Sequence, residues 1–310
     1  MKRLASIGFS WGHEYGQPPK TPEQLERDMR RVQEILVRIG YGHAFDPKRF
    51  YYDFHNVEVG SELFNVLIEE LQKDPHLARP GSISIETRYT RKELGSAELL
   101  IWGPTNQAIE DDCYDFFAED EEHRDLYRYC SACGAPHEQI REIVINKARM
   151  GKREVSLTYS NEVILSERVG QLLQEQGLTG FELWPVHHYK KAYKGEPTLY
   201  QLRVTHVLPP MASPPTEFDP VWTRHCEVCG RTGHYLRREH WWGKIHYYED
   251  TDVYYPRSVL KVVKDFNHTV EWFGDLRVTH RWIIITQRVY RLLLEHKVKN
   301  WAAVPVYLAK

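Results

Sequence analysis

Hydrophobic residues recur at helical spacing in two stretches of the first third of the chain. Residues 21–24 combine a Thr N-cap, a proline at the first helical position and a capping-box glutamine, and they predict a helix that runs to Gly40. Its expected inner face holds Leu25, Met29, Val32, Ile35, Leu36 and Ile39. A second helix is predicted over residues 61–73, with Leu63, Phe64, Leu67, Ile68 and Leu71 turned inward.

After these two helices, hydrophobic and polar residues alternate with a period of two. Residues 82–89 alternate as a half-buried strand does, residues 90–93 form another capping box that opens a short helix, and residues 99–102 read as a buried strand. We therefore predict an N-terminal α+β region over residues 1–105, joined by an acidic connecting segment over residues 106–129 to the rest of the chain.

An internal repeat is the main pattern of the remaining sequence. Residues 163–175 align without a gap to residues 283–295, and both copies continue to an aromatic residue and then Pro-Val, always 120 residues apart. In each copy a β-branched strand precedes a Ser or Thr N-cap and a helix that buries Val, Leu and Leu at i, i+3 and i+4. Two related strand–helix–strand units that pack against each other are the expected result.

Two Cys-x-x-Cys-Gly motifs precede the two copies, and we call them the first knuckle (residues 130–134) and the second knuckle (residues 226–230). Because neither copy has four cysteines, each is expected to give two thiolates to one shared structural zinc. The predicted ligands are Cys130, Cys133, Cys226 and Cys229. The fold class is thus α+β: an N-terminal helix and strand region, plus two related strand–helix–strand units pinned by a four-cysteine zinc site.

A shared zinc site predicts that residues 130–310 form one zinc-binding domain, with repeat copies at 130–208 and 226–310. The second copy carries about 24 extra residues, since the knuckles are 96 residues apart and the helices 120. The predicted insertion, around residues 231–255, is rich in histidine and aromatic residues. Cys113 stands apart and is expected to be a buried thiol.

Composition narrows the class of protein. The 310 residues are 42% hydrophobic and 27% charged, and the net charge of −2 gives no global attraction to nucleic acid or membrane. The N-terminus lacks the apolar core of a signal peptide, and no 18-residue apolar run occurs. We expect a cytoplasmic protein, where reducing conditions favour thiolates on a metal over disulfides.

Two surfaces are candidates for partner binding. The acidic stretch is either a solvated segment or a surface for a basic partner, with Asp111, Asp112, Asp120 and Glu121 as its candidate residues. The aromatic residues of the insertion, Trp241 and Trp242 among them, suit either ordinary packing, a protein interface or stacking on bases. A protein partner is favoured over nucleic acid because no extended basic face is present.

Catalysis is a further alternative. His225, His234, His240 and His246 crowd the second knuckle and could build a hydrolase or nuclease site. No spacing matches a helix-borne two-histidine zinc site, a P-loop or a nucleophile elbow, so we expect a protein that is not an enzyme.

The two knuckles, with the strand, capped helix and Pro-Val ending after each, resemble the bacterial double-CXXCG motif proteins. The resemblance covers residues 127–310. Some members of that family are immunity proteins, which bind and neutralise a cognate toxin. The resemblance therefore implies a zinc-binding immunity protein with a toxin as partner, and it transfers the four cysteines as metal ligands and no catalytic residue. A nucleic-acid-binding zinc protein is the alternative.

Overall fold

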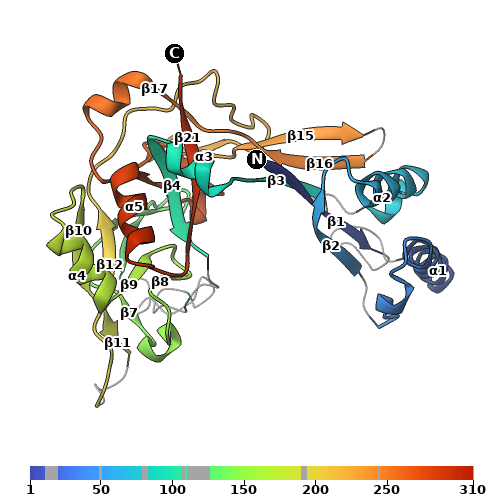
Figure 1. The fold of residues 1–310 in the computed structure, drawn as a ribbon, viewed down its shortest axis with the longest axis horizontal. Helices are drawn as coiled ribbons and strands as arrows, with labels where there is room; N and C mark the ends of the chain where they lie inside the picture. The colour runs from blue at the N-terminus through green and yellow to red at the C-terminus, as the bar shows by residue number, and fades with distance from the viewer. Residues whose placement is uncertain are drawn as a thin grey trace. The chain divides into compact units, whose positions relative to one another are not determined.

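A computed structural model describes residues 1–10, 20–48, 51–78, 83–105, 109, 126–189, 194–242 and 245–309 of the chain. The chain forms two compact units, which we call the smaller and the larger unit (Figure 1). The smaller unit consists of Met1–Thr90 and Leu236–Thr251, and the larger unit consists of Arg91–Tyr235 and Asp252–Lys310. The fold is mixed α and β, as the sequence predicts.

The smaller unit is built on a five-stranded sheet with the order β15-β16-β3-β1-β2. Its strands are β1 (Lys2–Ser10), β2 (Tyr51–Glu58), β3 (Ile83–Arg88), β15 (Arg237–Trp242) and β16 (Ile245–Asp250). β1 pairs antiparallel with both β2 and β3, whereas β16 runs parallel to β3. The insertion predicted within the second repeat copy therefore contributes a hairpin to the N-terminal sheet, because β16 pairs with the strand that would otherwise be its edge.

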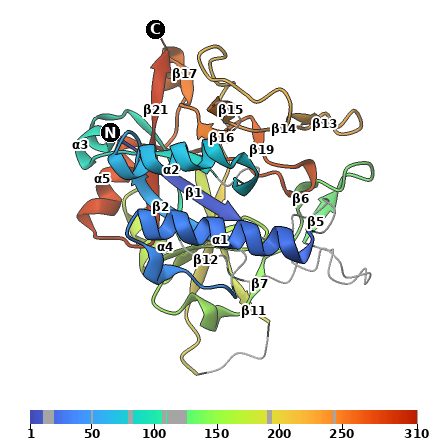
Figure 2. The same cartoon turned by 90° about the vertical axis from the view of Figure 1, so that its right-hand side faces the viewer.

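Two amphipathic helices cover one face of this sheet, as Figure 2 shows for α1 (Pro22–Arg38) and α2 (Glu62–Lys73). The capping box before α1 is present in full, and the Ser61 hydroxyl accepts a hydrogen bond from the Phe64 N–H at the start of α2. Both predicted helices are thus confirmed, with the expected inner faces. Ile7 and Phe9 of β1 pack with Leu36 and Leu67 in a core from which water is excluded.

The larger unit holds two sheets of matching design. The first has the order β10-β12-β9-β8, and the second has the order β17-β21-β4-β20-β18. The first is formed by β8 (Val155–Leu157), β9 (Val163–Ser166), β10 (Phe181–Pro185) and β12 (Leu199–Val204). The second is formed by β4 (Leu99–Pro104), β17 (Tyr254–Pro256), β18 (Phe266–His268), β20 (Ile283–Thr286) and β21 (Trp301–Ala309).

The strand–helix–strand segments of the two sheets correspond residue by residue. Helix α4 (Glu167–Glu175) follows β9, and helix α5 (Gln287–Glu295) follows β20 and starts 120 residues after α4. The turns after the helices also agree, because φ is positive at Gly177 and Gly180 and at the equivalent Lys297 and Asn300. The repeated sequence pattern thus gives the same strand, helix and turn twice. The predicted N-caps differ, because the Ser166 hydroxyl caps α4 whereas the Thr286 hydroxyl donates to Asp265 and does not cap α5.

One strand of the second sheet comes from an unexpected place. In the first sheet β12 lies between β9 and β10, with Leu202 opposite Val163. In the second sheet the same position is taken by β4, with Trp102 opposite Ile283, although β4 precedes both knuckles in the chain. The compact unit accordingly begins at Arg91, and not after residue 105 as the predicted boundary has it, because β4 and α3 (Arg91–Ser96) pack with the C-terminal half.

Reciprocal polar contacts join the two segments. The Asp265 carboxylate accepts a hydrogen bond from the Thr179 N–H at 2.9 Å, and the Glu154 carboxylate accepts one from the Lys299 N–H, the equivalent position, at 2.7 Å. Arg168 likewise donates to Glu154, and its equivalent Arg288 donates to Asp265. Each half thus supplies a carboxylate to the turn of the other half, above a shared core of buried Val, Ile and Leu residues.

Short elements complete the chain. The short strands are β5 (Tyr127–Tyr129), β6 (Pro136–Gln139), β7 (Val144–Ile145), β11 (His187–His188), β13 (Arg224–His225), β14 (Thr232–His234) and β19 (Trp272–Phe273). The 3-10 turns are η1 (Gly42–Ala44), η2 (Pro75–Leu77), η4 (Lys147–Met150), η5 (Arg257–Lys261) and η6 (Leu276–Val278). Among the described residues, none of the helices has both the length and the apolar character that a membrane span requires.

Candidate metal centre

The first knuckle is the turn between the antiparallel strands β5 and β6. The Gly134 N–H donates to the Cys130 carbonyl at 2.9 Å, and the Cys130 N–H donates to the Ala135 carbonyl at 2.9 Å. Gly134 has φ +69°, a conformation that glycine adopts without steric cost. The two thiols are held on one side of a tight loop by this backbone geometry.

The second knuckle is the turn between β13 and β14 and has the same backbone bonds. The Gly230 N–H donates to the Cys226 carbonyl at 2.8 Å, and the Cys226 N–H donates to the Arg231 carbonyl at 2.9 Å. Gly230 also has φ +69°. Two identical loops 96 residues apart thus present the same pair of sulfur atoms.

The fold brings the four sulfurs together. Cys130 Sγ lies 3.9 Å from Cys226 Sγ, Cys133 Sγ lies 3.8 Å from Cys229 Sγ, and all four lie within 4.8 Å of one another. These separations exclude a disulfide, whose sulfurs lie about 2.05 Å apart. Metal–sulfur bonds of about 2.3 Å in a tetrahedron place the sulfurs about 3.8 Å apart, so the cluster fits a bound metal ion.

The electrostatics of the cluster favour a cation. The N–H groups of Cys133 and Ala132 lower the pKa of the Cys130 thiol to about 6, and those of Cys229 and Val228 lower the pKa of Cys226. Burial, followed by the neighbouring sulfurs, raises the pKa of Cys133 to about 12. Four thiolates at this distance repel one another electrostatically, and a divalent cation between them would offset that repulsion.

A buried arginine lies beside the sulfurs. Arg231, which follows the second knuckle, is 6% exposed, and its guanidinium carbon lies 3.6 Å from the centroid of the Trp272 ring. It also donates to the Thr279 hydroxyl at 3.2 Å. Burial lowers the pKa of Arg231, but the nearby thiolates oppose this change, so its charge offsets part of the negative charge of the four sulfurs.

The other predicted site residues are placed differently. Asp111, Asp112, Asp120, Glu121 and Cys113 lie outside the described residues. Trp241 and Trp242 lie on β15, the last strand of the smaller unit's sheet, at positions paired with His246 and Ile245.

Among the side chains that the structure describes, only the four cysteines bring three or more ligand atoms together, so neither His225 nor His234 belongs to a metal cluster there. His225 bonds to the Thr232 hydroxyl at 2.9 Å and is exposed. His234 lies 4.5 Å from the Phe218 ring, and burial lowers its pKa. His240 and His246 are on opposite strands of the β15–β16 hairpin, in the smaller unit.

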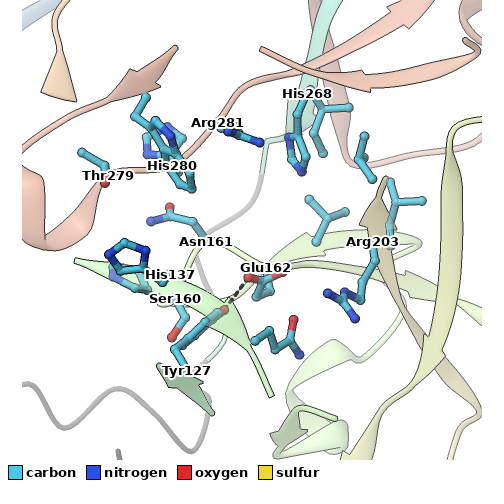
Figure 3. Close-up of a pocket in the computed structure, with 17 residues that line it drawn as sticks. Tyr127, His137, Ser160, Asn161, Glu162, Arg203, His268, Thr279, His280 and Arg281 are labelled. Atoms are coloured by element: carbon cyan, nitrogen blue, oxygen red, sulfur yellow. Dashed lines mark hydrogen bonds between the residues drawn. The ribbon is translucent and has the colours of Figure 1, made fainter. Parts of the chain in front are cut away.

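The larger unit contains a cavity of about 280 Å³ that the sequence does not predict. Its walls come from residues 127–163, 202–204 and 268–283 of the larger unit, and they include His137, Glu162, Arg203, His268 and Arg281 (Figure 3). No motif links these three segments. The adjacent residues His280 and Arg281, which follow the second knuckle in the sequence, are the only signal for this cavity. A pair of residues is too short to be a specific motif.

In comparisons with known proteins, no family model and no curated protein matches this chain. The resemblance to the double-CXXCG motif proteins therefore rests on the knuckles and on the strand–helix–strand pattern that follows each of them.

Proposed function

We propose that the four cysteines hold one structural zinc ion and that the protein is an immunity-type protein that binds and neutralises a cognate bacterial toxin. Zinc is supported by the donor set, since four thiolates at tetrahedral spacing are a preferred environment for this ion. Four protein ligands also leave no coordination position for water, so the ion stabilises the fold and does not activate a nucleophile.

The immunity role is supported by one observation, the two Cys-x-x-Cys-Gly frames in the order and context of the double-CXXCG motif proteins. Such a protein acts by occluding its toxin, and this requires a surface and not a catalytic group. Strand β15, with Trp241 and Trp242, ends the sheet of the smaller unit as described. An edge strand offers backbone donors and acceptors to a partner, and tryptophans are frequent interface anchors.

Metal analysis of the purified protein tests the zinc assignment. We expect one zinc per chain, and Cys130→Ser and Cys226→Ser should each lose it, because each removes one of four shared ligands. Cys113→Ser, which changes a cysteine outside both knuckles, is the matched control and should keep the metal. Two zinc ions per chain, or one that survives either knuckle substitution, would refute a shared site.

The immunity role is tested by first examining the genes beside this one for a secreted toxin and then co-expressing any such toxin with this protein. Co-expression should restore growth to cells that produce the toxin, and the purified proteins should form a stoichiometric complex that a Trp241→Ala, Trp242→Ala double variant weakens. If the protein instead binds DNA or RNA with an affinity that falls steeply as salt rises, and ignores the toxin, it is a nucleic-acid-binding protein.

A further inference from the structure

The larger unit contains a polar cavity whose two sides belong to different parts of the chain. Residues 127–163 and 202–204 form one side, and residues 268–283 form the other. Figure 3 shows His280, Arg281 and His268 along one side, Tyr127 and Ser160 on the opposite side, and Glu162 between them. The volume of about 280 Å³ is near the lower limit of small-molecule sites.

Three nitrogen atoms of the lining residues are enclosed without a partner. Arg281 Nε, His268 Nδ1 and His280 Nδ1 are shielded from solvent and have no hydrogen-bond partner among the described residues. A buried donor that is left unpaired costs about 1–3 kcal/mol, so such groups normally meet an acceptor. Arg281 Nε can only donate. Burial lowers the pKa of both histidines, and a neutral ring donates through Nδ1 in the tautomer that carries the proton on that nitrogen.

The charges of the lining favour an anion. Two guanidinium groups, Arg203 and Arg281, face the cavity with one carboxylate, Glu162. The oxygens of Glu162 already accept hydrogen bonds from the Tyr127 hydroxyl and from Gln201 Nε2. Burial, and then the charge of Arg281, lowers the pKa of His268 to about 4, and an anion beside both groups would reverse the second of these effects.

We propose that this cavity binds a small ligand through an anionic oxygen group, either a phosphate or a carboxylate. Arg281 contacts the anion as a charged donor, with His268 and His280 beside it. The cavity is too small for a nucleotide, so the ligand is of the size of inorganic phosphate or a short dicarboxylate. The site is independent of the proposed toxin partner.

The metal centre adjoins both sides of the cavity. His137 lines it and follows the first knuckle, and Cys130 is within hydrogen-bonding reach of the His137 side chain. Trp272 lines it too, with the Arg231 guanidinium 3.6 Å and the Arg281 guanidinium 4.5 Å from its ring centroid. Because Arg231 follows the second knuckle, the zinc ion of the proposed function, on which this step rests, would hold both sides in place. Ligand binding therefore depends on the metal.

Isothermal titration of the zinc-loaded full-length protein tests the site, with inorganic phosphate in one arm and succinate in the other. We expect saturable binding in at least one arm, and the arm that binds identifies phosphoryl or carboxylate chemistry. Arg281→Gln and His280→Gln should each weaken binding at least tenfold. Arg257→Gln, which changes an exposed arginine paired with Glu98, should not.

Thermal unfolding of each variant shows whether it is folded. If Arg281→Gln does not fold, the binding affinity of His280→Gln tests the proposal. No binding of either anion by the wild-type protein would overturn the proposal, and so would binding by the folded variants with unchanged affinity. Removal of the metal should abolish binding while the helical circular dichroism signal persists. Unchanged affinity without metal would overturn the dependence on the metal centre.

Discussion

Gly180 is predicted to be the least replaceable glycine of the larger unit, because its φ is positive and its space is also filled by backbone. It lies in the turn after α4 with φ +89°, and a Cβ at this position would lie 2.1 Å from the carbonyl oxygen of Phe266 and 2.8 Å from Lys264 Cβ. A carbonyl oxygen cannot rotate away as a side chain can. Gly180→Ala must therefore move two chain segments apart.

The expected cost has two parts. The left-handed conformation costs a residue with a Cβ about 1–2 kcal/mol. Forced separation adds about 1–3 kcal/mol, as overpacking does in cores, because it strains the hydrogen bonds from the Phe266 N–H to the Thr179 carbonyl and from the Thr205 N–H to the Gly180 carbonyl. The sum, about 2–5 kcal/mol, corresponds to a fall in melting temperature of roughly 4–20 °C for a domain of this size.

Gly177 in the same turn is the matched control. It also has a positive φ, +58°, but nothing lies within 4 Å of where its Cβ would be. Gly177→Ala should therefore cost only the conformational term, about 1–2 kcal/mol, and the equivalent position in the second half already holds Lys297 with φ +51°. Thermal and urea unfolding of the metal-loaded protein compare the two variants. Equal losses would refute the reasoning from steric overlap.

Three further predictions concern ion pairs and metal. Glu70→Gln should destabilise the smaller unit by about 1–3 kcal/mol in urea unfolding, because the 1% exposed Glu70 side chain pairs with three cations, whereas Glu69→Gln, at a 65% exposed side chain, should change little. Burial raises the pKa of Glu70, but its cationic partners outweigh burial and lower the pKa below 4.5. The stability from this group is therefore present above pH 4.5 and is lost as the pH falls further. If Glu70→Gln lost stability between pH 4.5 and lower pH as steeply as the wild-type protein does, this reasoning would be contradicted. Asp265→Ala should cost about 1–3 kcal/mol because it strands the Thr179 N–H and hydroxyl, both 2.9 Å from its carboxylate, and a loss no larger than that of exposed Glu175→Ala would argue against it. Chelation should lower the melting temperature of the wild-type protein but not of Cys226→Ser, and an equal shift in both would show that the chelator acts elsewhere.

The local elements were predictable where one chemical pattern spans a whole element. The two N-terminal helices carry both a cap and an apolar stripe, and the structure places them at Pro22–Arg38 and Glu62–Lys73. Helix α4 follows from the same two signals, and α5 from its apolar stripe, since Thr286 makes no capping hydrogen bond. The identical geometry of the two knuckles also follows from five residues each, because the bonds that shape the loop are local.

Non-local pairing could not be predicted. Residues 99–102 read correctly as a buried strand, but nothing in their sequence tells that they pair with β20 and β21 and not with the N-terminal sheet. The β15–β16 hairpin is the converse case. In the sequence it lies between two segments of the larger unit, yet it pairs with β3 of the smaller unit. An apolar strand fits any sheet whose register buries it, so the partner is decided by the whole fold.

Two kinds of contact join the two halves of the larger unit, and each kind stabilises different segments. The shared apolar core and the reciprocal carboxylates Glu154 and Asp265 fix the strand–helix–strand segments, and these contacts need no metal. The knuckles stand on β5–β6 and β13–β14, short strands with few buried residues of their own. Such strands gain little from burial, and the metal proposed to be shared by their turns would supply the missing order. The four cysteines would therefore secure the knuckles and the cavity walls beside them, more than the core that the repeated sequence builds.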